Sequence, residues 1–273
     1  MKAAMTEVVL LDRPAPHVAR LMINRPDKRN AIDLAVRQGL TEALLALQGD
    51  DTVRALVFGG VGGVFSAGGD LPSMAGLDEA GARERMQQVQ RLCALVANVG
   101  RPVVSAVEGF AAGAAVGLAL LGDHIVVGPG TKMLFPFLSL GLAPDWGQML
   151  TLPRRIGVPA ARRILTAGVP VSGDEALRIG LADTLVPDAD VMATAVQRAA
   201  AMALLPLQAF ARTKHRLDNP SATLAEELAR EEADQVVCLL GDEFREGYDA
   251  FAKKRKPDFT SIPSRAGNPG AKA

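Results

Sequence analysis

Two glycine-rich segments, each directly after an apolar run typical of a buried strand, constrain the fold of this chain most strongly. They are residues 65–70 (FSAGGD) and residues 108–115 (EGFAAGAA). Glycine lets a backbone N–H group approach a ligand closely, and a helix beginning near Gly113 would direct free amides and its positive dipole end at that ligand. Together the segments predict an oxyanion hole, in which two amides bind a developing negative charge. Taken singly, each pair of glycines would indicate no more than a tight turn.

The composition is that of a globular chain with balanced charge. The 273 residues are 49% hydrophobic, which is enough for one large core and an appended subdomain. Lysine and arginine number 30, as do aspartate and glutamate, so no overall field attracts nucleic acid. The uncharged stretch over residues 109–122 is shorter than the roughly 20 residues of a membrane helix, so we expect a buried helix and no membrane partner.

The cysteines and the first residues favour a cytoplasmic protein. Cys93 and Cys238 both lie in apolar helical patterns, which predicts two buried free thiols in a reducing compartment. Charged residues from Glu7 onward interrupt the N-terminal segment too early for a signal peptide, so we expect no export.

Strand and helix patterns alternate along most of the chain. Short apolar runs predict strands at residues 8–11, 18–23, 55–58, 103–107 and 125–127. Helical spacing predicts one helix capped by Asp33 and another that follows Asp78 and stops at Gly100. The alternation through about residue 190 indicates repeated βαβ units.

After Pro187 only helical patterns remain. Pro206 suits the first turn of a helix, and Thr223 with Glu226 matches a capping box. The predicted organisation is therefore a core with the substrate site over residues 1–190, a helical oligomerisation subdomain over 191–259 and a disordered tail over 260–273.

Several ordered motifs together resemble those of the crotonase, or enoyl-CoA hydratase/isomerase, superfamily. The similarity covers roughly residues 6–259. The motifs are residues 24–31 (NRPDKRNA), 65–71 (FSAGGDL), 101–104 (RPVV) with Gly109 and Gly113, 141–144 (GLAP), 152–155 (LPRR), 172–176 (SGDEA) with 180–181 (GL), and 251–255 (FAKKR).

The resemblance implies an α/β fold, a crotonase-like spiral of ββα units with a helical C-terminal trimerisation subdomain. The implied substrate is an acyl-CoA thioester, so coenzyme A belongs to the substrate and no separate cofactor is expected. The implied assembly is a homotrimer or a dimer of trimers. Carried over by motif position, the two oxyanion donors are the amides of Gly69 and Ala114.

The same resemblance assigns the positions that bind substrate. Coenzyme A would contact Arg29, Asn30, Ala31, Ile32, Asp70 and Leu71. Phe251 and Lys254 match positions that often reach the CoA of a neighbouring subunit, although a solvated helix end explains Lys254 equally well. The other assigned positions are Ser66, Ala67, Met74, Gly113, Gly117, Phe137 and Trp146.

The chain departs from a hydratase at two positions that matter for catalysis. Hydratases of the superfamily hold a water between two glutamates, whose aligned positions here are Gly117 and Phe137. Asp145 instead resembles the acidic residue of several enoyl-CoA isomerases in the same loop. A single carboxylate can take a proton from C2 or C4 and return it to the other carbon, which moves a double bond from C3 to C2.

An N-cap role is the competing interpretation of Asp145, because it follows a proline and precedes a helical run. The two roles do not exclude each other. Phe137, Trp146 and Leu142 could make the site dry, which would raise the pKa of the Asp145 carboxyl.

Other functions remain open at this point. Asp145 could act as a nucleophile, as in the aryl-CoA dehalogenases, although Phe137 stands where those enzymes have a tryptophan. A hydratase-like lyase and a non-catalytic CoA-binding scaffold are further alternatives, whereas the neutral charge disfavours an RNA-binding relative. His17, His124 and His215 lack the spacing of metal ligands, so no metal is expected.

Overall fold

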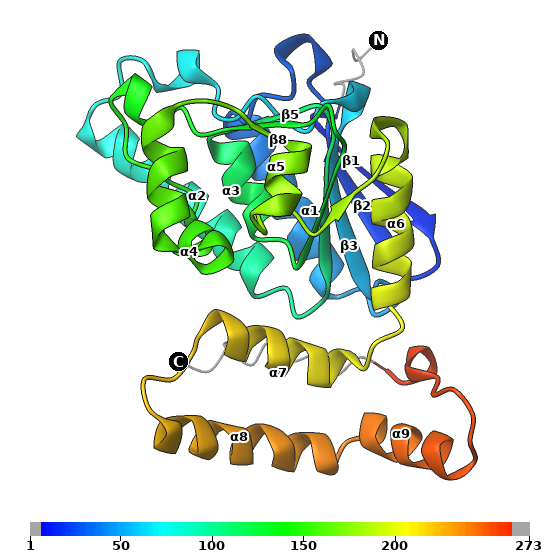
Figure 1. Ribbon diagram of the computed structural model, residues 1–273. Coiled ribbons are helices and arrows are strands. Elements are labelled where there is room, and N and C mark those ends of the chain that lie inside the picture. The colour runs from blue at the N-terminus through cyan, green and yellow to red at the C-terminus, as the bar shows by residue number, and fades with distance from the viewer. Residues whose placement is uncertain (1–6, 264–273) are drawn as a thin grey trace.

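The computed structural model describes residues 7–263, and a six-stranded sheet forms the centre of the body (Figure 1). Its strand order is β1-β2-β3-β4-β6-β9, with β1 antiparallel to β2 and every other neighbouring pair parallel. The strands are β1 (Val9–Ala15), β2 (Val18–Ile23), β3 (Ala55–Gly60), β4 (Val103–Val107), β6 (His124–Val127) and β9 (Thr184–Leu185). A smaller sheet contains β5 (Phe110–Ala112), β7 (Lys132–Leu134) and β8 (Val171–Ser172).

Helices separate these strands along the chain. The body contains α1 (Leu34–Gln48), α2 (Glu79–Ala97), α3 (Ala114–Leu120), α4 (Gln148–Ala167), α5 (Gly173–Arg178) and α6 (Val191–Met202). Short 3₁₀ turns are η1 (Pro26–Lys28), η2 (Val61–Gly63), η3 (Leu71–Met74), η4 (Leu138–Leu140) and η5 (Asp188–Asp190). Asp33 caps α1 by accepting from the Val36 amide at 3.0 Å, and Asp78 caps α2 by accepting from Gly81 at 2.8 Å. Both predicted helix starts are confirmed.

The main core lies on the face of the sheet that α1, α2 and α3 cover. Phe58, Phe65 and Leu92 are among its fully buried side chains. β3 and β4 are buried along their whole lengths, which explains why they are continuous apolar runs. These strands end at the two glycine-rich loops, so the sheet places both loops on one side of the body.

The predicted boundary after residue 190 is wrong, because α6 belongs to the body. Val191, Ala195 and Ala199 form a buried stripe on α6 that packs on the opposite face of the sheet, against β2, β3, β4 and β6. Small side chains at intervals of four residues allow this close approach. The separate helical unit therefore begins with α7.

Three helices form a layer beside the body (Figure 1). They are α7 (Leu207–Asp218), α8 (Leu224–Leu239) and α9 (Asp242–Ala252). Lys214 on α7 joins this layer to the body through an ion pair with Asp123 at 2.8 Å. No residue of α8 is buried, and apolar side chains are exposed along the layer, including Leu240 at 72% and Phe251 at 84%.

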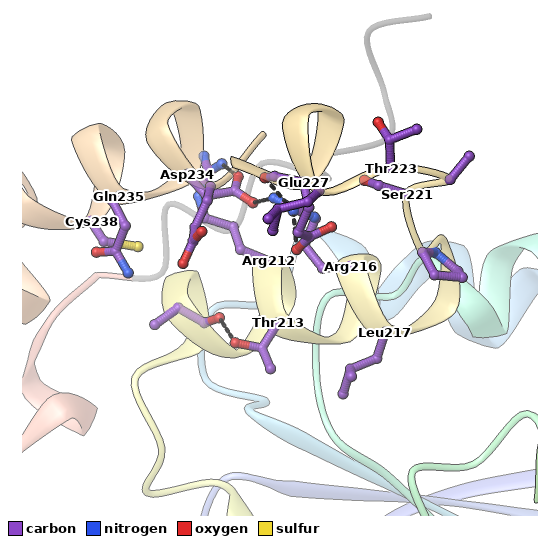
Figure 2. Close-up of a pocket in the computed structure, with 15 residues that line it drawn as sticks. Arg212, Thr213, Arg216, Leu217, Ser221, Thr223, Glu227, Asp234, Gln235 and Cys238 are labelled. Atoms are coloured by element: carbon purple, nitrogen blue, oxygen red, sulfur yellow. Dashed lines mark hydrogen bonds and ion pairs between the residues drawn. The ribbon is translucent and has the colours of Figure 1, made fainter. Parts of the chain in front are cut away.

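A groove of about 780 Å³ lies between α7 and α8. Figure 2 shows Arg212 and Arg216 of α7 directed at acidic residues of α8. Asp234 pairs with Arg212 at 2.5 Å and with Arg216 at 3.1 Å, while Glu227 also pairs with Arg216. These bonds fix the two helices relative to each other.

The C-terminal segment and the cysteines partly differ from expectation. The chain forms a 3₁₀ turn, η6 (Phe259–Ser261), at the start of the predicted disordered tail, whose residues 264–273 lie outside the described residues. Cys93 and Cys238 are free thiols, but both are half-buried, which corrects the expectation of full burial. Within residues 7–263, no helix combines the length and hydropathy needed to cross a membrane.

Candidate active site

The two glycine-rich loops place a pair of free amides close together. Among the described residues, neither the Gly69 N–H nor the Ala114 N–H has an intrachain acceptor, and Ala114 is the first residue of α3. A Cβ atom on Gly68 would lie 3.6 Å from the Ala114 nitrogen. Covalent geometry then places the Gly69 and Ala114 nitrogens within about 7 Å of each other. This spacing is compatible with two donors to one oxygen atom.

Backbone conformation at the first loop requires glycine. Gly68 has φ of +88°, and a Cβ atom there would clash with the carbonyl oxygen of Ala112. Close contact between the two loops therefore depends on the absence of this side chain.

Ser66 and Asn30 hold the first loop in place from inside the protein. The Ser66 hydroxyl donates to the Asn30 carbonyl oxygen at 2.7 Å and accepts from the Gly68 amide at 3.0 Å. The Asn30 side chain donates to the Val64 carbonyl oxygen at 2.7 Å. Because Ser66 and Asn30 are fully buried, their side chains support the loop and do not face a ligand.

The predicted CoA-contacting segment, residues 29–32, is already well bonded within the chain. The amides of Arg29, Asn30, Ala31 and Ile32 donate to Pro26, Arg25, Lys28 and Gly68 respectively. A nucleotide here would therefore use the second lone pairs of carbonyl oxygens or the exposed Arg29 side chain. Ala31 and Ile32 are buried, whereas Ala67 is half-buried.

The neighbouring turn, η3, positions three further predicted residues. Asp70 caps the turn by accepting from Ser73 at 3.3 Å and lies 3.6 Å from Arg25. Leu71 begins the turn and is exposed. Met74 ends it, and its Cε atom lies where a side chain on Gly69 would go. The Met74 side chain thus packs on the first oxyanion segment.

Asp145 lies in the loop before α4, and the N-cap interpretation is wrong. The capping position is Gly147, and Asp145 Oδ1 is buried without a hydrogen-bond partner in the described part of the chain. An unpaired buried carboxyl oxygen is costly in a folded protein, and such groups are found at reactive sites. Oδ1 is therefore available to accept a proton from a bound molecule.

Gln148 joins the Asp145 loop to the second glycine-rich loop. Its side-chain Nε2 donates to the Gly113 carbonyl oxygen and to the Asp145 carbonyl oxygen, each at 3.1 Å. Gln148 is fully buried. This bond places the candidate base next to the start of α3, where Ala114 presents its amide.

Neither position aligned with a hydratase glutamate carries a carboxylate, and Gly117 has no room for a side chain. A Cβ atom on Gly117 would clash with the Cβ of Trp146 and lie 3.1 Å from Gln148 Nε2. Phe137 packs its ring near Gly113, with Cζ 3.6 Å from where a Cβ would be. Trp146 fills the space beside Gly117 with a left-handed backbone, φ +53°. Phe137 and Trp146 thus occupy the positions around which hydratases of the superfamily hold a water between two glutamates.

Burial raises the pKa of the Asp145 carboxyl above its ordinary value, and the Arg85 guanidinium opposes this effect. Phe137 and Trp146 are buried beside the loop, as expected for a dry site. Leu142 is 44% exposed and does not enclose the carboxyl, which corrects the expectation for this residue.

Arg85 and Gln148 are the site residues that sequence reasoning missed. Arg85 lies on α2, and its Nη2 atom is 3.3 Å from where a Cβ of Gly69 would be. The exposed positions that surround Arg85 on α2 gave no sign that it faces the site. Gln148 follows Asp145 by three residues, and this spacing could have suggested a hydrogen bond from its side chain to the Asp145 carbonyl oxygen.

Phe251 and Lys254 do not meet these residues within one chain. Both are exposed at the end of α9, in the layer beside the body, whereas Gly69 and Asp145 belong to the body (Figure 1).

The histidines have structural partners and no arrangement for a metal. His124 Nε2 lies 2.9 Å from Thr184 Oγ1, and His17 Nδ1 lies 3.1 Å from the Thr52 carbonyl oxygen. Residues 7–263 contain no group of three or more His, Cys, Asp or Glu side chains suited to a metal ion.

Comparison with known proteins identifies the family to which the chain is similar. The family model described as enoyl-CoA hydratase/isomerase matches residues 15–262. A Rhodobacter capsulatus protein named probable enoyl-CoA hydratase is 36% identical, with 89% of this chain and 94% of that protein covered. The 1,2-epoxyphenylacetyl-CoA isomerase of Escherichia coli is 33% identical, with 89% and 95% covered.

Solved structures show the same fold. The enoyl-CoA hydratase of Bacillus anthracis superimposes with a TM-score of 0.87 at 26% identity, covering 93% of this chain and 99% of that one. The resemblance of the motifs is therefore confirmed over nearly the whole length. The chain belongs to the enoyl-CoA hydratase/isomerase family, and it has the crotonase fold.

Proposed function

We propose that the protein is an enoyl-CoA isomerase that moves a double bond from C3 to C2 of an acyl-CoA thioester. The observation that carries this proposal is the buried Oδ1 atom of Asp145, which has no hydrogen-bond partner among the described residues, in a loop bonded to the segment of the free Ala114 amide. Both kinds of group are needed for reversible proton transfer next to a thioester, and one base is sufficient.

In the proposed reaction, the Asp145 carboxylate takes a proton from C2 of a 3-enoyl-CoA. The C–H electron pair forms the C1–C2 double bond, and negative charge collects on the thioester oxygen. The amides of Gly69 and Ala114 stabilise this dienolate. Protonated Asp145 then gives its proton to C4, the C2–C3 double bond forms, and the thioester carbonyl is restored.

Two observations favour isomerisation over hydration. Gly117 and Phe137 supply no carboxylate, so only one acid or base is present where hydration would use two. The tight contact of Gly117 with Trp146 also occupies the space beside that position. The Escherichia coli relative is named as an isomerase of a different CoA thioester, 1,2-epoxyphenylacetyl-CoA, so isomerisation of an acyl-CoA is an activity assigned to a similar chain.

We further propose a homotrimer or a dimer of trimers in which Phe251 and Lys254 approach the CoA of a neighbouring subunit. The exposed apolar residues of the α7–α9 layer support this assembly, because large exposed apolar patches are typical of interaction surfaces. Coenzyme A is then part of the substrate, and the reaction needs no separate cofactor. A cytoplasmic location fits the free thiols.

The decisive experiment offers the purified protein 3-hexenoyl-CoA and 2-hexenoyl-CoA in separate reactions. Conjugation of the thioester on isomerisation increases its ultraviolet absorbance, whereas addition of water to the 2-enoyl thioester decreases it. We expect an increase with the 3-enoyl substrate and no formation of 3-hydroxyhexanoyl-CoA by mass spectrometry. Hydration of the 2-enoyl substrate without isomerisation would contradict the proposal. Acyl-CoA binding without turnover of either compound would favour a scaffold.

A further inference from the structure

Arg85 is a half-buried cation beside the candidate oxyanion hole that no direct protein contact neutralises. Its Nη2 atom lies 3.3 Å from where a Cβ of Gly69 would be, so the guanidinium is packed against that segment. Among the described residues, Arg85 forms neither an ion pair nor a side-chain hydrogen bond. An unpaired cation at this depth is unfavourable for folding, because part of its hydration is lost.

The charges around Arg85 come from four segments of the chain. The negative charges of Asp145, in the loop before α4, and of Asp70, before η3, raise the pKa of Arg85 and so oppose the effect of its burial. Arg37 approaches from α1 and adds positive charge. Cys93, on α2 itself, is near Asp145, and burial raises the pKa of its thiol to about 12, so it is neutral at ordinary pH.

Of the two carboxylates near Arg85, only Asp145 lacks another cation among the described residues. Asp70 lies close to Arg25 and caps the η3 turn. The guanidinium of Arg37 donates through Nε and Nη2 to the neutral side chain of Gln88, so Arg37 is a second cation and cannot take the place of Asp145 as a partner of Arg85. Arg85 and Asp145 are thus two opposite unpaired charges at one site, too far apart for a direct ion pair and close enough to interact electrostatically.

The proposed reaction moves negative charge between these positions. Before proton transfer the charge is on Asp145, and afterwards it is on the thioester oxygen next to the Gly69 amide. Arg85 is near both places, so a positive charge accompanies the negative charge throughout. A fixed cation that needs no rearrangement during the reaction is an efficient way to stabilise developing charge.

We infer that Arg85 is the electrostatic partner of the proton transfer, because its guanidinium, packed against the Gly69 segment, supplies a positive charge to the base before the reaction and to the dienolate oxygen after it. This inference rests on the proposed isomerase function. Lysine at the same position would keep the charge with a different shape, whereas methionine would keep much of the packing and remove the charge.

The experiment compares Arg85→Met and Arg85→Lys with the wild type, and uses Arg83→Met as a matched control. Arg83 lies on the same helix with its side chain 68% exposed, so its removal changes net charge without touching the site. We expect Arg85→Met to lower kcat by about tenfold or more with little change in KM. Arg85→Lys should recover part of this loss, and Arg83→Met should behave as the wild type.

A second measurement does not depend on turnover. The carboxyl carbon of Asp145 is titrated by NMR in protein labelled with ¹³C-aspartate and assigned by Asp145→Asn. Loss of the nearby cation should raise the pKa of Asp145 in Arg85→Met and leave it unchanged in Arg83→Met. The acidic limb of the kcat/KM profile should move to higher pH by the same amount.

The outcomes separate this inference from the proposed function. An unchanged Asp145 pKa in Arg85→Met, or a wild-type kcat, overturns the role of Arg85 even if the enzyme isomerises its substrate. If the wild type turns over no 3-enoyl-CoA but the Asp145 pKa rises in Arg85→Met, the isomerase proposal fails and the electrostatic pairing of the two residues stands.

Discussion

The side-chain amide of Gln148 donates to the carbonyl oxygen of Gly113, the residue directly before the candidate oxyanion donor Ala114. The same Nε2 atom also donates to the Asp145 carbonyl oxygen. One buried side chain thereby connects the loop of the candidate base to the helix start that presents the amide. The relative position of base and oxyanion hole thus depends on a residue that carries out no chemistry itself.

Gln148→Met should lower kcat by about tenfold while leaving stability nearly unchanged. The two carbonyl oxygens keep backbone partners, from Gly117 and from residue 148 itself, so little desolvation is left uncompensated. Activity falls because the base loop loses its connection, and small displacements of reacting groups are costly. Gln87→Met, at an exposed glutamine on α2, is the matched control. Steady-state kinetics measures kcat and thermal unfolding measures stability in both variants. Equal kcat values for Gln148→Met and Gln87→Met would contradict the prediction.

Asp145→Asn should abolish most isomerisation, with kcat lower by about 10² or more and acyl-CoA affinity little changed. The wild-type rate should also fall as the pH drops below the raised pKa of Asp145, because the protonated carboxyl cannot accept a proton. Steady-state kinetics and calorimetric binding of a saturated acyl-CoA measure the two effects. Near-normal turnover by Asp145→Asn would require another base.

The same substitution should not destabilise the fold at neutral pH. Burial raises the folded-state pKa of Asp145 above its ordinary value of 3.8, so the ionised carboxyl opposes folding. The protonated carboxyl of Asp145 therefore contributes to the free energy of unfolding. This contribution is complete below pH 3.8 and is lost as the pH rises through the pKa of the folded state. Asp145→Asn should therefore be at least as stable as the wild type at pH 7, with an advantage that shrinks towards pH 3.8. Denaturant unfolding at several pH values tests this sign.

Local signals predicted much of the fold, because the responsible interactions lie within a few residues. Asp33 and Asp78 cap the helices that they precede, and the apolar runs became the buried strands β3 and β4. The α6 helix was assigned to the wrong unit, because its spacing predicts a helix but not the sheet face that it covers. Its stripe of Val191, Ala195 and Ala199 was the available signal.

The candidate site was predicted less completely, for a physical reason. Gly69, Ala114 and Asp145 belong to motifs that could be recognised one by one, and the structure brings their segments together. Arg85 meets Gly69 only through the packing of α2 on the body, and the Gly117–Trp146 contact joins distant segments. Such contacts depend on tertiary packing, which no local pattern contains.

Gly117→Ala should destabilise the protein by about 1–3 kcal/mol and lower kcat, because the added methyl group would clash with Trp146 and displace the Asp145 loop. Gly117→Glu should not create hydratase activity, since the space for the carboxylate is already filled. Gly247→Ala on α9 is the control, because its nearest neighbour atom would be 3.8 Å away. Denaturant unfolding and product analysis by mass spectrometry test these expectations. Hydration by a stable Gly117→Glu variant would disprove them.

Gly68→Ala should be more harmful than Gly76→Ala, although both glycines have positive φ, +88° and +74°. A side chain on Gly76 would meet no atom within 4 Å, so only conformational strain of about 1–2 kcal/mol is expected. At Gly68 the same strain is joined by a clash with the Ala112 carbonyl oxygen, which pushes the two oxyanion segments apart. We therefore expect both variants to lose stability, Gly68→Ala more than Gly76→Ala, and only Gly68→Ala to lose kcat. Equal losses of activity in both variants would refute the proposed closeness of the segments.

Phe251→Glu should weaken assembly and substrate binding together. Phe251 is 84% exposed in the single chain and lies in the layer whose apolar side chains we propose to cover with neighbouring subunits. A buried glutamate at such an interface would be strongly unfavourable. Light scattering should give three or six times 28.6 kDa for the wild type and smaller species for the variant at micromolar concentration. The acyl-CoA KM should rise with dissociation, because residues 251 and 254 are proposed to act on the neighbouring site.

Leu45→Glu, at a half-exposed leucine on α1, controls for the added charge. A wild type that remains a 28.6 kDa monomer with full activity would remove both the proposed assembly and the shared site.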